Sequence, residues 1–303
     1  MQNQLSKKYN SDIAFSPIII GTMRLGNWGS NLSTDELEKF IDACLELGFK
    51  DFDHADIYGH YTEEERFGQV IKRRPDLKSK IQITTKCGIR IVTPNRPQHH
   101  IKSYDATAEH IIWSAENSLK QLGVDCLDVM LIHRPDYLMD PHEVAEAFHQ
   151  LENDGKVKAF GVSNFSPSQF ETLNSFFPLL TNQVEISLLH RNAFEDGTLD
   201  QCLRLGIRPT AWSPFGGGRI FTDTTSPEIQ KIKAVIDQLG ETHKASSDQI
   251  LLAFLRKHPS GILPIIGSSK ITRIQSAHQA LDIKLSHEEW YRLWEAAIGE
   301  EVA

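Results

Sequence analysis

Three ionisable side chains lie at or near the ends of apolar segments and could together donate a proton. Asp53 ends the segment GFKDFD, Tyr58 follows five residues later, and Lys86 ends the segment IQITTK. A lysine that ends a buried strand needs a counter-charge because a desolvated ammonium is costly, and Asp53 is the natural partner. A nearby cation also favours the phenolate and lowers the pKa of a tyrosine from its usual value of about 10. The three residues therefore predict a general acid that gives up its proton near neutral pH.

Further polar side chains lie at the ends of other predicted strands. These are His133 at the end of LDVMLIH, Ser163 and Asn164 after the next strand, then Gln183 and Trp212. The carboxyl ends of the strands of an α/β barrel meet on one face, and active sites of such barrels are built there. The histidine could therefore hydrogen-bond the same substrate oxygen that the tyrosine protonates.

Short β-rich segments alternate with helical patterns along the chain. The predicted strands are Ser16–Met23, Phe49–His54, Ile81–Lys86, Leu127–His133, Val157–Ser163, Asn182–Ile186, Ile207–Trp212 and Ile262–Ile266. The predicted helices that follow them are Thr34–Leu47, Glu63–Arg73, Ala106–Leu122, Pro141–Asp154, Ser166–Phe176, Thr198–Leu205, Ser246–His258 and Thr272–Ala280, with Pro227–Leu239 and Ser286–Ala297 as two extra helices. Eight such units favour an α/β fold of the closed (β/α)8 TIM-barrel type over an open doubly wound sheet. No linker divides residues 1–303, so a single domain is predicted.

Composition excludes several classes of protein. The chain has 303 residues, of which 40% are apolar and 24% charged, and this composition is typical of a globular protein. Its net charge of −8 argues against nucleic acid as a partner, because phosphate binding needs a basic face. No apolar segment approaches the ~20 residues that span a bilayer, and residues 1–12 contain no apolar segment of signal-peptide type. A cytoplasmic protein is predicted.

The sequence also lacks the common nucleotide and metal motifs. No GxGxxG follows a strand, and Asn27 stands where a P-loop would need lysine after Gly21–Gly26. Any dinucleotide must therefore be bound in another way. The four cysteines form no CxxC pair, and no metal site is predicted. His54 and Asp56 could be interpreted as a metal pair of a barrel hydrolase, but no third ligand is evident.

Seven segments in register resemble motifs of the aldo-keto reductase family. They are GFKDFDHADIYG (48–59), TTKCG (84–88), LIHRPD (131–136), GVSNFSPSQF (161–170), NQVEIS (182–187), AWSPFGGGR (211–219) and PIIGSSKITRI (264–274). The catalytic tetrad of that family matches Asp53, Tyr58, Lys86 and His133. The resemblance implies that hydride passes from NADPH to an aldehyde or ketone, with Tyr58 as proton donor and without a metal.

The resemblance also implies a set of cofactor-binding residues. Ser163, Asn164 and Gln183 match positions that bind the nicotinamide carboxamide, Trp212 matches the aromatic residue that stacks on the nicotinamide ring, and Thr22 and Met23 are placed at the cofactor too. Ser213, Pro214, Gly216, Gly217, Gly218 and Arg219 match the pyrophosphate loop, where glycines let backbone N–H groups approach phosphate. Ser268, Ser269, Lys270 and Arg273 match the site of the adenosine 2′-phosphate. The two cations would favour NADPH over NADH.

Several positions depart from the family pattern. His54 stands where relatives have serine or threonine, and Met23 stands where several have tryptophan. Ser276 and Ala277 fall near places where relatives have an acidic residue and an asparagine, so the contacts to the adenine depart from the family pattern. The chain ends soon after its last predicted helix, which predicts an open pocket. The basic segment 88–105 could favour acidic substrates or could simply be solvated.

Two functions stay open at this point. The tetrad favours an NADP-dependent oxidoreductase that acts on a small-molecule carbonyl substrate. The alternative is an NADP(H)-binding sensor or regulatory barrel with little turnover. The resemblance favours a monomer.

Overall fold

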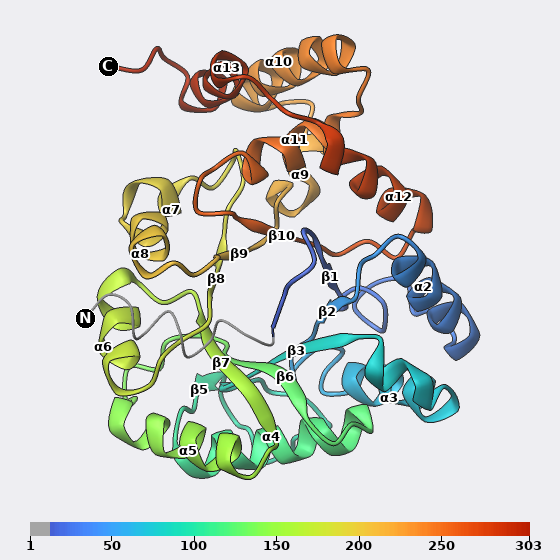
Figure 1. Cartoon of the computed structure of the whole chain (residues 1–303), viewed down its shortest axis with the longest axis vertical. Helices are drawn as coiled ribbons and strands as arrows, with labels where there is room; N and C mark the ends of the chain where they lie inside the picture. The colour runs from blue at the N-terminus through green and yellow to red at the C-terminus, as the bar shows by residue number, and fades with distance from the viewer. Residues whose placement is uncertain (1–12) are drawn as a thin grey trace.

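The computed structural model describes residues 13–303, so the prediction made on residues 1–12 lies outside the described residues. Eight parallel strands close into a barrel in the order β1-β10-β9-β8-β7-β6-β3-β2, at the centre of Figure 1. They are β1 (Ile19–Gly21), β2 (Asp51–Asp53), β3 (Gln82–Cys87), β6 (Leu127–Ile132), β7 (Val157–Ser163), β8 (Asn182–Glu185), β9 (Thr210–Trp212) and β10 (Leu263–Ile266). The predicted (β/α)8 barrel is confirmed.

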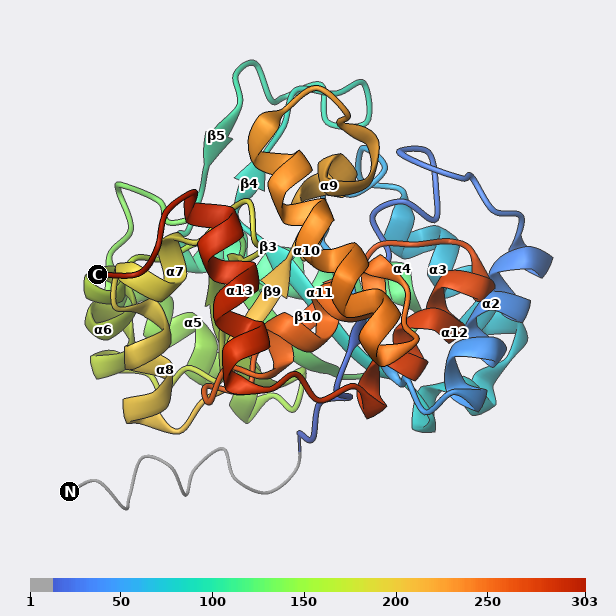
Figure 2. The ribbon, with the colours of Figure 1, turned by 90° about the horizontal axis from the view of Figure 1, so that it is seen from above.

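Helices surround the barrel, as Figure 1 shows. They are α2 (Thr34–Glu46), α3 (Glu63–Arg73), α4 (Ala108–Leu122), α5 (Pro141–Asn153), α6 (Pro167–Phe176), α7 (Asn192–Glu195), α8 (Thr198–Leu205), α9 (Arg219–Thr222), α10 (Pro227–His243), α11 (Ser247–Arg256), α12 (Ile271–Gln279) and α13 (His287–Ile298). The two predicted extra helices correspond to α10 and α13, which lie side by side in Figures 1 and 2. No helix in residues 13–303 is long and apolar enough to cross a membrane.

Local sequence signals explain where the helices begin and end. Ser33 caps α2 and forms a capping box with Glu36, so two otherwise unpaired N–H groups find acceptors. Gly123 ends α4 in the left-handed conformation, with φ of 68°, which glycine adopts without a steric penalty. The predicted start of α2 and the predicted end of α4 are correct for this reason. The predicted start of α4 at Ala106 is two residues early, because Thr107 is the cap and the helix begins at Ala108.

The pleat of the short strands decides which side chains enter the barrel. In β2, Phe52 packs outward against Phe67 of α3, with ring centroids 5.3 Å apart. Successive side chains of a strand point to opposite faces, so the neighbouring Asp53 points into the barrel. β2 pairs with β3 in the register Phe52↔Ile83, and Ile83 belongs to the same outer core. By the same alternation Lys86 also points inward.

Part of the basic segment 88–105, between β3 and α4, is ordered as a hairpin. β4 (Ile89–Arg90) pairs antiparallel with β5 (Ser103–Tyr104), and Figure 2 shows this hairpin and α9 on the same side of the barrel. The guanidinium of Arg96 lies 4.6 Å from the ring centre of Tyr61 and 5.4 Å from that of Trp113. Two-residue strands show no sequence periodicity, which is why the hairpin was not predicted.

We expect Gly68→Ala to destabilise the barrel wall between α3 and α4. A Cβ at Gly68 would lie 2.0 Å from the main-chain oxygen of Gln121, which belongs to the backbone and cannot swing away. Overpacking should lower the free energy of unfolding by about 3 kcal/mol, more than the ~1 kcal/mol gained from helix propensity. Chemical denaturation measures the change. Gly267→Ala is the control, because a Cβ there has no heavy atom within 4 Å; equal stability of both variants would contradict this packing.

Candidate active site

The ammonium group of Lys86 is the centre of a buried cluster at the carboxyl ends of β2 and β3. Its Nζ lies 2.8 Å from Asp53 Oδ2, 2.6 Å from the main-chain oxygen of His54 and 3.3 Å from the Tyr58 hydroxyl. The side chains of Lys86 and Asp53 are 0% and 4% exposed. The structure therefore confirms that Lys86 pairs with Asp53, and it places the hydroxyl of Tyr58 in contact with the same ammonium group.

The surroundings set the protonation states of this cluster. Burial disfavours the charged form of Lys86, but Asp53 and Tyr58 outweigh it, so the pKa of Lys86 lies above its ordinary value. Burial also raises the pKa of Tyr58, and Lys86 opposes this rise only in part. The predicted net lowering of the Tyr58 pKa is thus corrected, because enclosure of the phenol outweighs one cation. Tyr58 keeps its proton at neutral pH and releases it only to a strong acceptor.

His133 follows β6 and faces Tyr58. The two ring centroids are 6.2 Å apart, and the rings are nearly perpendicular. Burial, with help from the Lys86 and Arg134 charges, holds the pKa of His133 well below its ordinary value. Its Nδ1 is buried and has no hydrogen-bond partner among the described residues. A neutral imidazole at this position can donate one hydrogen bond to an oxygen that Tyr58 also reaches.

The predicted nicotinamide-binding residues form one hydrogen-bonded chain that ends on Asp53. Gln183 Nε2 donates to Asp53 Oδ1 at 2.9 Å, and Ser163 Oγ donates to the main-chain oxygen of Gln183 at 2.8 Å. Asn164 Nδ2 donates to Ser163 Oγ at 2.7 Å, and Trp212 Nε1 donates to Asn164 Oδ1 at 3.0 Å. This chain joins β7, β8 and β9 to the lysine cluster, so the aromatic ring of Trp212 has a fixed orientation.

Thr22 and His54 connect the end of β1 to the end of β2. The Thr22 side chain is fully buried, and its Oγ1 lies 3.0 Å from both the main-chain oxygen of Asp53 and His54 Nδ1. Burial lowers the pKa of His54 to about 3, so the ring is neutral. Met23 is more than one-third exposed. That Thr22 and Met23 contact a cofactor stays a prediction.

The segment after β9 has the geometry of a phosphate-binding loop. Ser213 has a φ of 50°, Gly216, Gly217 and Gly218 all have positive φ, and α9 begins at Arg219. A Cβ at Gly217 or Gly218 would meet no atom within 4 Å, so the backbone faces open space. Pro214, in the same segment, is buried. The N–H groups of Gly216 and Gly218 donate to the main-chain oxygens of Ser213 and Phe215, at 2.9 and 3.0 Å, which leaves the N–H of Gly217 for an anion.

A second group of predicted cofactor residues lies at the start of α12. Ser268 Oγ accepts a hydrogen bond from the Lys270 N–H at 3.2 Å, and Lys270, the residue before α12, provides no side-chain cap. The first N–H groups of this helix are therefore available to an anion. Lys270 and Arg273 are exposed, and no carboxylate of the described residues pairs with either. The hydroxyls, cations and free N–H groups suit a phosphate.

Arg134 also lies at the candidate site, although it is not among the predicted site residues. Its guanidinium lies 5.6 Å from the ring centre of Trp212, and its charge acts on both Tyr58 and His133. Lys102, in the basic segment 88–105, also acts on His133. The position of Arg134 directly after a strand-end histidine was the available signal.

Two further carboxyl groups are buried close to Lys86. Glu64 accepts hydrogen bonds from Thr85 at 2.6 Å and Ser118 at 3.0 Å, and burial raises its pKa to about 7. Burial also raises the pKa of Asp56 well above its ordinary value. No group of three or more His, Cys, Asp or Glu residues in the described part of the chain is arranged to hold a metal ion.

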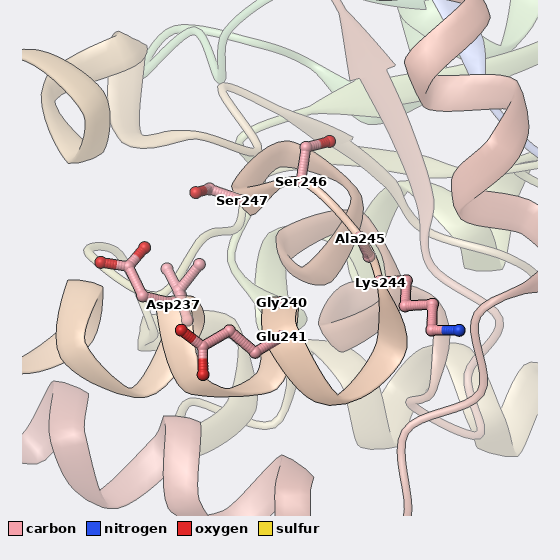
Figure 3. Close-up of a pocket in the computed structure, with 8 residues that line it drawn as sticks. Asp237, Gly240, Glu241, Lys244, Ala245, Ser246 and Ser247 are labelled. Carbon is pink, nitrogen blue, oxygen red and sulfur yellow. The ribbon is translucent and has the colours of Figure 1, made fainter.

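A separate groove of about 520 Å³ lies between α10 and the start of α11. Figure 3 shows its lining residues, which include Asp237, Glu241, Lys244 and Ser247. None of the side chains in the lysine cluster lines it. The groove is therefore distinct from the chemistry at the carboxyl ends of the strands.

We expect the Lys86–Asp53 pair to matter for stability through its charge balance. Asp53→Asn leaves a buried ammonium without its counter-charge and should lower the free energy of unfolding by about 3 kcal/mol. The double variant Asp53→Asn with Lys86→Met removes both charges and should recover most of that loss. Urea denaturation of the single and double variants measures the coupling, and simple additivity of the two losses would contradict it.

Comparison with known proteins identifies the family of this chain. A model of the Aldo/keto reductase family matches residues 17–298. The chain is 46% identical over 290 residues to oxidoreductase YdhF of Escherichia coli (strain K12), with 95% of each chain covered. It is 39% identical over 293 residues to a 6-dehydroglucose reductase of Agrobacterium fabrum, with 96% of this chain and 97% of that protein covered.

A solved structure gives the same result at the level of the fold. The thermostable aldo-keto reductase Tm1743, determined with the inhibitor epalrestat, superposes with a TM-score of 0.79 at 25% identity, over 95% of this chain and 97% of that chain. The family match, the close relatives and the shared barrel together show that the chain belongs to the aldo-keto reductase family of oxidoreductases.

Proposed function

We propose that this protein is an NADPH-dependent reductase of aldehydes or ketones and that Tyr58 is its proton donor. The observation that supports this most strongly is the 3.3 Å contact between the Tyr58 hydroxyl and the Lys86 ammonium inside a buried site. A protonated phenol beside a fixed cation suits a reaction in which negative charge develops on oxygen. A barrel that only binds a nucleotide has no need for this pair.

Each residue of the tetrad then has a distinct task. A nicotinamide cofactor, when bound, supplies the hydride that reduces the carbonyl carbon. Tyr58 donates its proton to the carbonyl oxygen as negative charge develops there, and Lys86 stabilises the phenolate that remains. Asp53 keeps Lys86 charged, and His133 donates a second hydrogen bond to the same oxygen. The phenolate regains a proton from solvent once the alcohol has left.

The hydrogen-bond donors and cations at the carboxyl ends of the strands, here called the barrel mouth, support NADPH as the cofactor. The glycine loop after β9 faces open space, and the backbone N–H of Gly217 is available to a pyrophosphate. Ser163, Asn164 and Gln183 form the hydrogen-bonded chain that reaches Trp212, against which the nicotinamide would stack. Ser268, Ser269, Lys270 and Arg273 provide hydroxyls and two cations that no carboxylate of the described residues neutralises. A 2′-phosphate would supply the missing negative charge.

The substrate class that we favour is a hydroxyl-rich aldehyde, such as an oxidised sugar. A relative that is 39% identical over nearly the whole chain is named for the reduction of 6-dehydroglucose. Arg134 lies over Trp212, and the charges of Arg134 and Lys102 both act on His133. The N–H groups of these two side chains can donate to hydroxyl oxygens. Trp28 provides an aromatic wall, because its ring centroid lies 6.1 Å from that of Tyr58. Polar donors together with an aromatic face suit a sugar.

Replacement of Tyr58 by phenylalanine tests the proton donor. Tyr58→Phe should reduce turnover of an aldehyde by on the order of a hundredfold or more while NADPH affinity stays near normal, because only the acid is lost. Loss of absorbance of the reduced nicotinamide measures turnover, and intrinsic fluorescence measures binding.

Tyr61→Phe is the matched control, because the Tyr61 hydroxyl donates to the main-chain oxygen of Ile89 and does not contact Lys86. Full activity of Tyr58→Phe would show that another group is the acid. Tight NADPH binding by the wild type without turnover of any aldehyde, ketone or quinone would instead favour a regulatory barrel.

Replacement of Arg273 by alanine tests the choice of cofactor. Arg273→Ala should weaken NADPH binding by roughly 1.5–3 kcal/mol, the size of a hydrogen bond to a charged group, and should barely change NADH binding. Arg204→Ala is the control, because Arg204 pairs with Glu171 between two outer helices. An equal loss for both cofactors would remove Arg273 from the 2′-phosphate site.

A further inference from the structure

Two hydroxyl groups from opposite ends of the sequence meet beside the predicted 2′-phosphate site. Ser30 Oγ, in the loop between β1 and α2, lies 2.5 Å from Ser269 Oγ, in the loop between β10 and α12. The two loops are neighbours because β1 pairs with β10 when the barrel closes. Ser30 and Ser269 are 239 positions apart in the sequence. No short motif can therefore contain both residues, and the motifs described above do not include Ser30.

The fold holds Ser30 at this position through bonds on both sides of it. The N–H of Ser30 donates to the main-chain oxygen of Arg24 at 2.9 Å. Arg66 Nη2 donates to the main-chain oxygen of Leu32 at 2.5 Å, and Asn27 Nδ2 donates to Thr62 Oγ1 at 3.3 Å. These bonds attach the β1–α2 loop to α3 and to the residue before it. The loop is therefore anchored to the barrel wall, and Ser30 has a defined place.

The loop also packs tightly against itself. A Cβ at Gly29 would lie 2.1 Å from the main-chain oxygen of Arg24, so only glycine fits next to Ser30. Trp28, the residue before Gly29, also packs against the protein, because its ring centroid lies 5.2 Å from that of His60 in an edge-to-face arrangement. The position of Ser30 is thus fixed by packing as well as by hydrogen bonds.

The surroundings of the two hydroxyls favour an anion. Lys270 and Arg273 bring two positive charges, and the first N–H groups of α12 lack a side-chain acceptor. No carboxylate of the described residues forms an ion pair with either cation. A serine hydroxyl can donate to a phosphate oxygen as readily as to another hydroxyl. An anion bound by Ser269 would therefore lie within reach of Ser30.

We propose that Ser30 is a ligand of the cofactor 2′-phosphate and that it helps the protein to prefer NADPH over NADH. This inference rests on the proposed function, because it assumes that the phosphate binds at the start of α12. When the phosphate binds, the Ser30 hydroxyl turns from Ser269 to a phosphate oxygen, and no covalent bond changes. The phosphate is then held between the β1–α2 loop on one side and α12 on the other.

Calorimetric titration of the full chain with NADPH, NADH and adenosine 2′,5′-bisphosphate tests this proposal. Ser30→Ala should raise the dissociation constants of NADPH and of the bisphosphate roughly tenfold, because each loses one hydrogen bond to a charged group. Affinity for NADH, which has no 2′-phosphate, should stay unchanged and also shows that the variant is folded.

Two more substitutions at the same position sharpen the test. Ser30→Thr keeps the hydroxyl and should retain wild-type affinity for NADPH. Ser30→Asp places a negative charge against the phosphate and should weaken NADPH binding more than Ser30→Ala does, again with a much smaller effect on NADH.

The outcomes separate this inference from the proposed function. If Arg273→Ala weakens NADPH binding selectively while Ser30→Ala leaves it unchanged or tightens it, the 2′-phosphate site stands and Ser30 is not its ligand. Tighter binding would mean that the Ser30–Ser269 bond competes with the cofactor. If neither substitution distinguishes NADPH from NADH, the phosphate site itself is misplaced and both proposals fail.

Discussion

A buried ion pair between Lys86 and Asp53 is the interaction on which the rest of the site depends. Its side chains are almost fully enclosed, and the Nζ–Oδ2 distance is 2.8 Å. An ammonium in such a place is tolerated only when its charge is compensated and its protons are bonded. The carboxylate of Asp53, the main-chain oxygen of His54 and the hydroxyl of Tyr58 accept these bonds. The barrel interior thus fixes a cation beside a phenol.

The carboxylate of Asp53 also needs hydrogen-bond donors, and these connect the ion pair to the neighbouring strands. Gln183 donates a hydrogen bond to the other carboxylate oxygen of Asp53. Further hydrogen bonds through Ser163 and Asn164 connect Gln183 to Trp212 on β9. These bonds form one connected network, so the ring of Trp212 and the cluster around Lys86 are held by the same set of hydrogen bonds. Such preorganisation suits proton transfer, since donors do not need to rearrange as charge develops.

Backbone strain and positive charge both gather at the mouth of this barrel. Among the described residues, Asn31, His60, Tyr61, Asn164 and Ser213 have positive φ and follow the strands, and Lys244 is the other non-glycine residue of this kind. Strained conformations commonly mark functional loops.

The chain carries a net charge of −8, yet Arg134, Lys270 and Arg273 lie at the carboxyl ends of the strands. A local group of cations on an acidic protein attracts an anionic ligand.

The sequence alone determined the barrel and most of the side chains at its mouth. Helix caps such as Ser33 and Gly123 act locally, and apolar strands in regular alternation with helices specify parallel pairing, so both could be inferred without coordinates. The pairing of Lys86 with Asp53 followed from the cost of a buried charge. Only the tertiary structure decided the net direction of the Tyr58 pKa, because burial depends on everything packed around the phenol. It also brought Arg134 over Trp212 and Ser30 against Ser269, since contacts between distant segments arise only when the barrel closes.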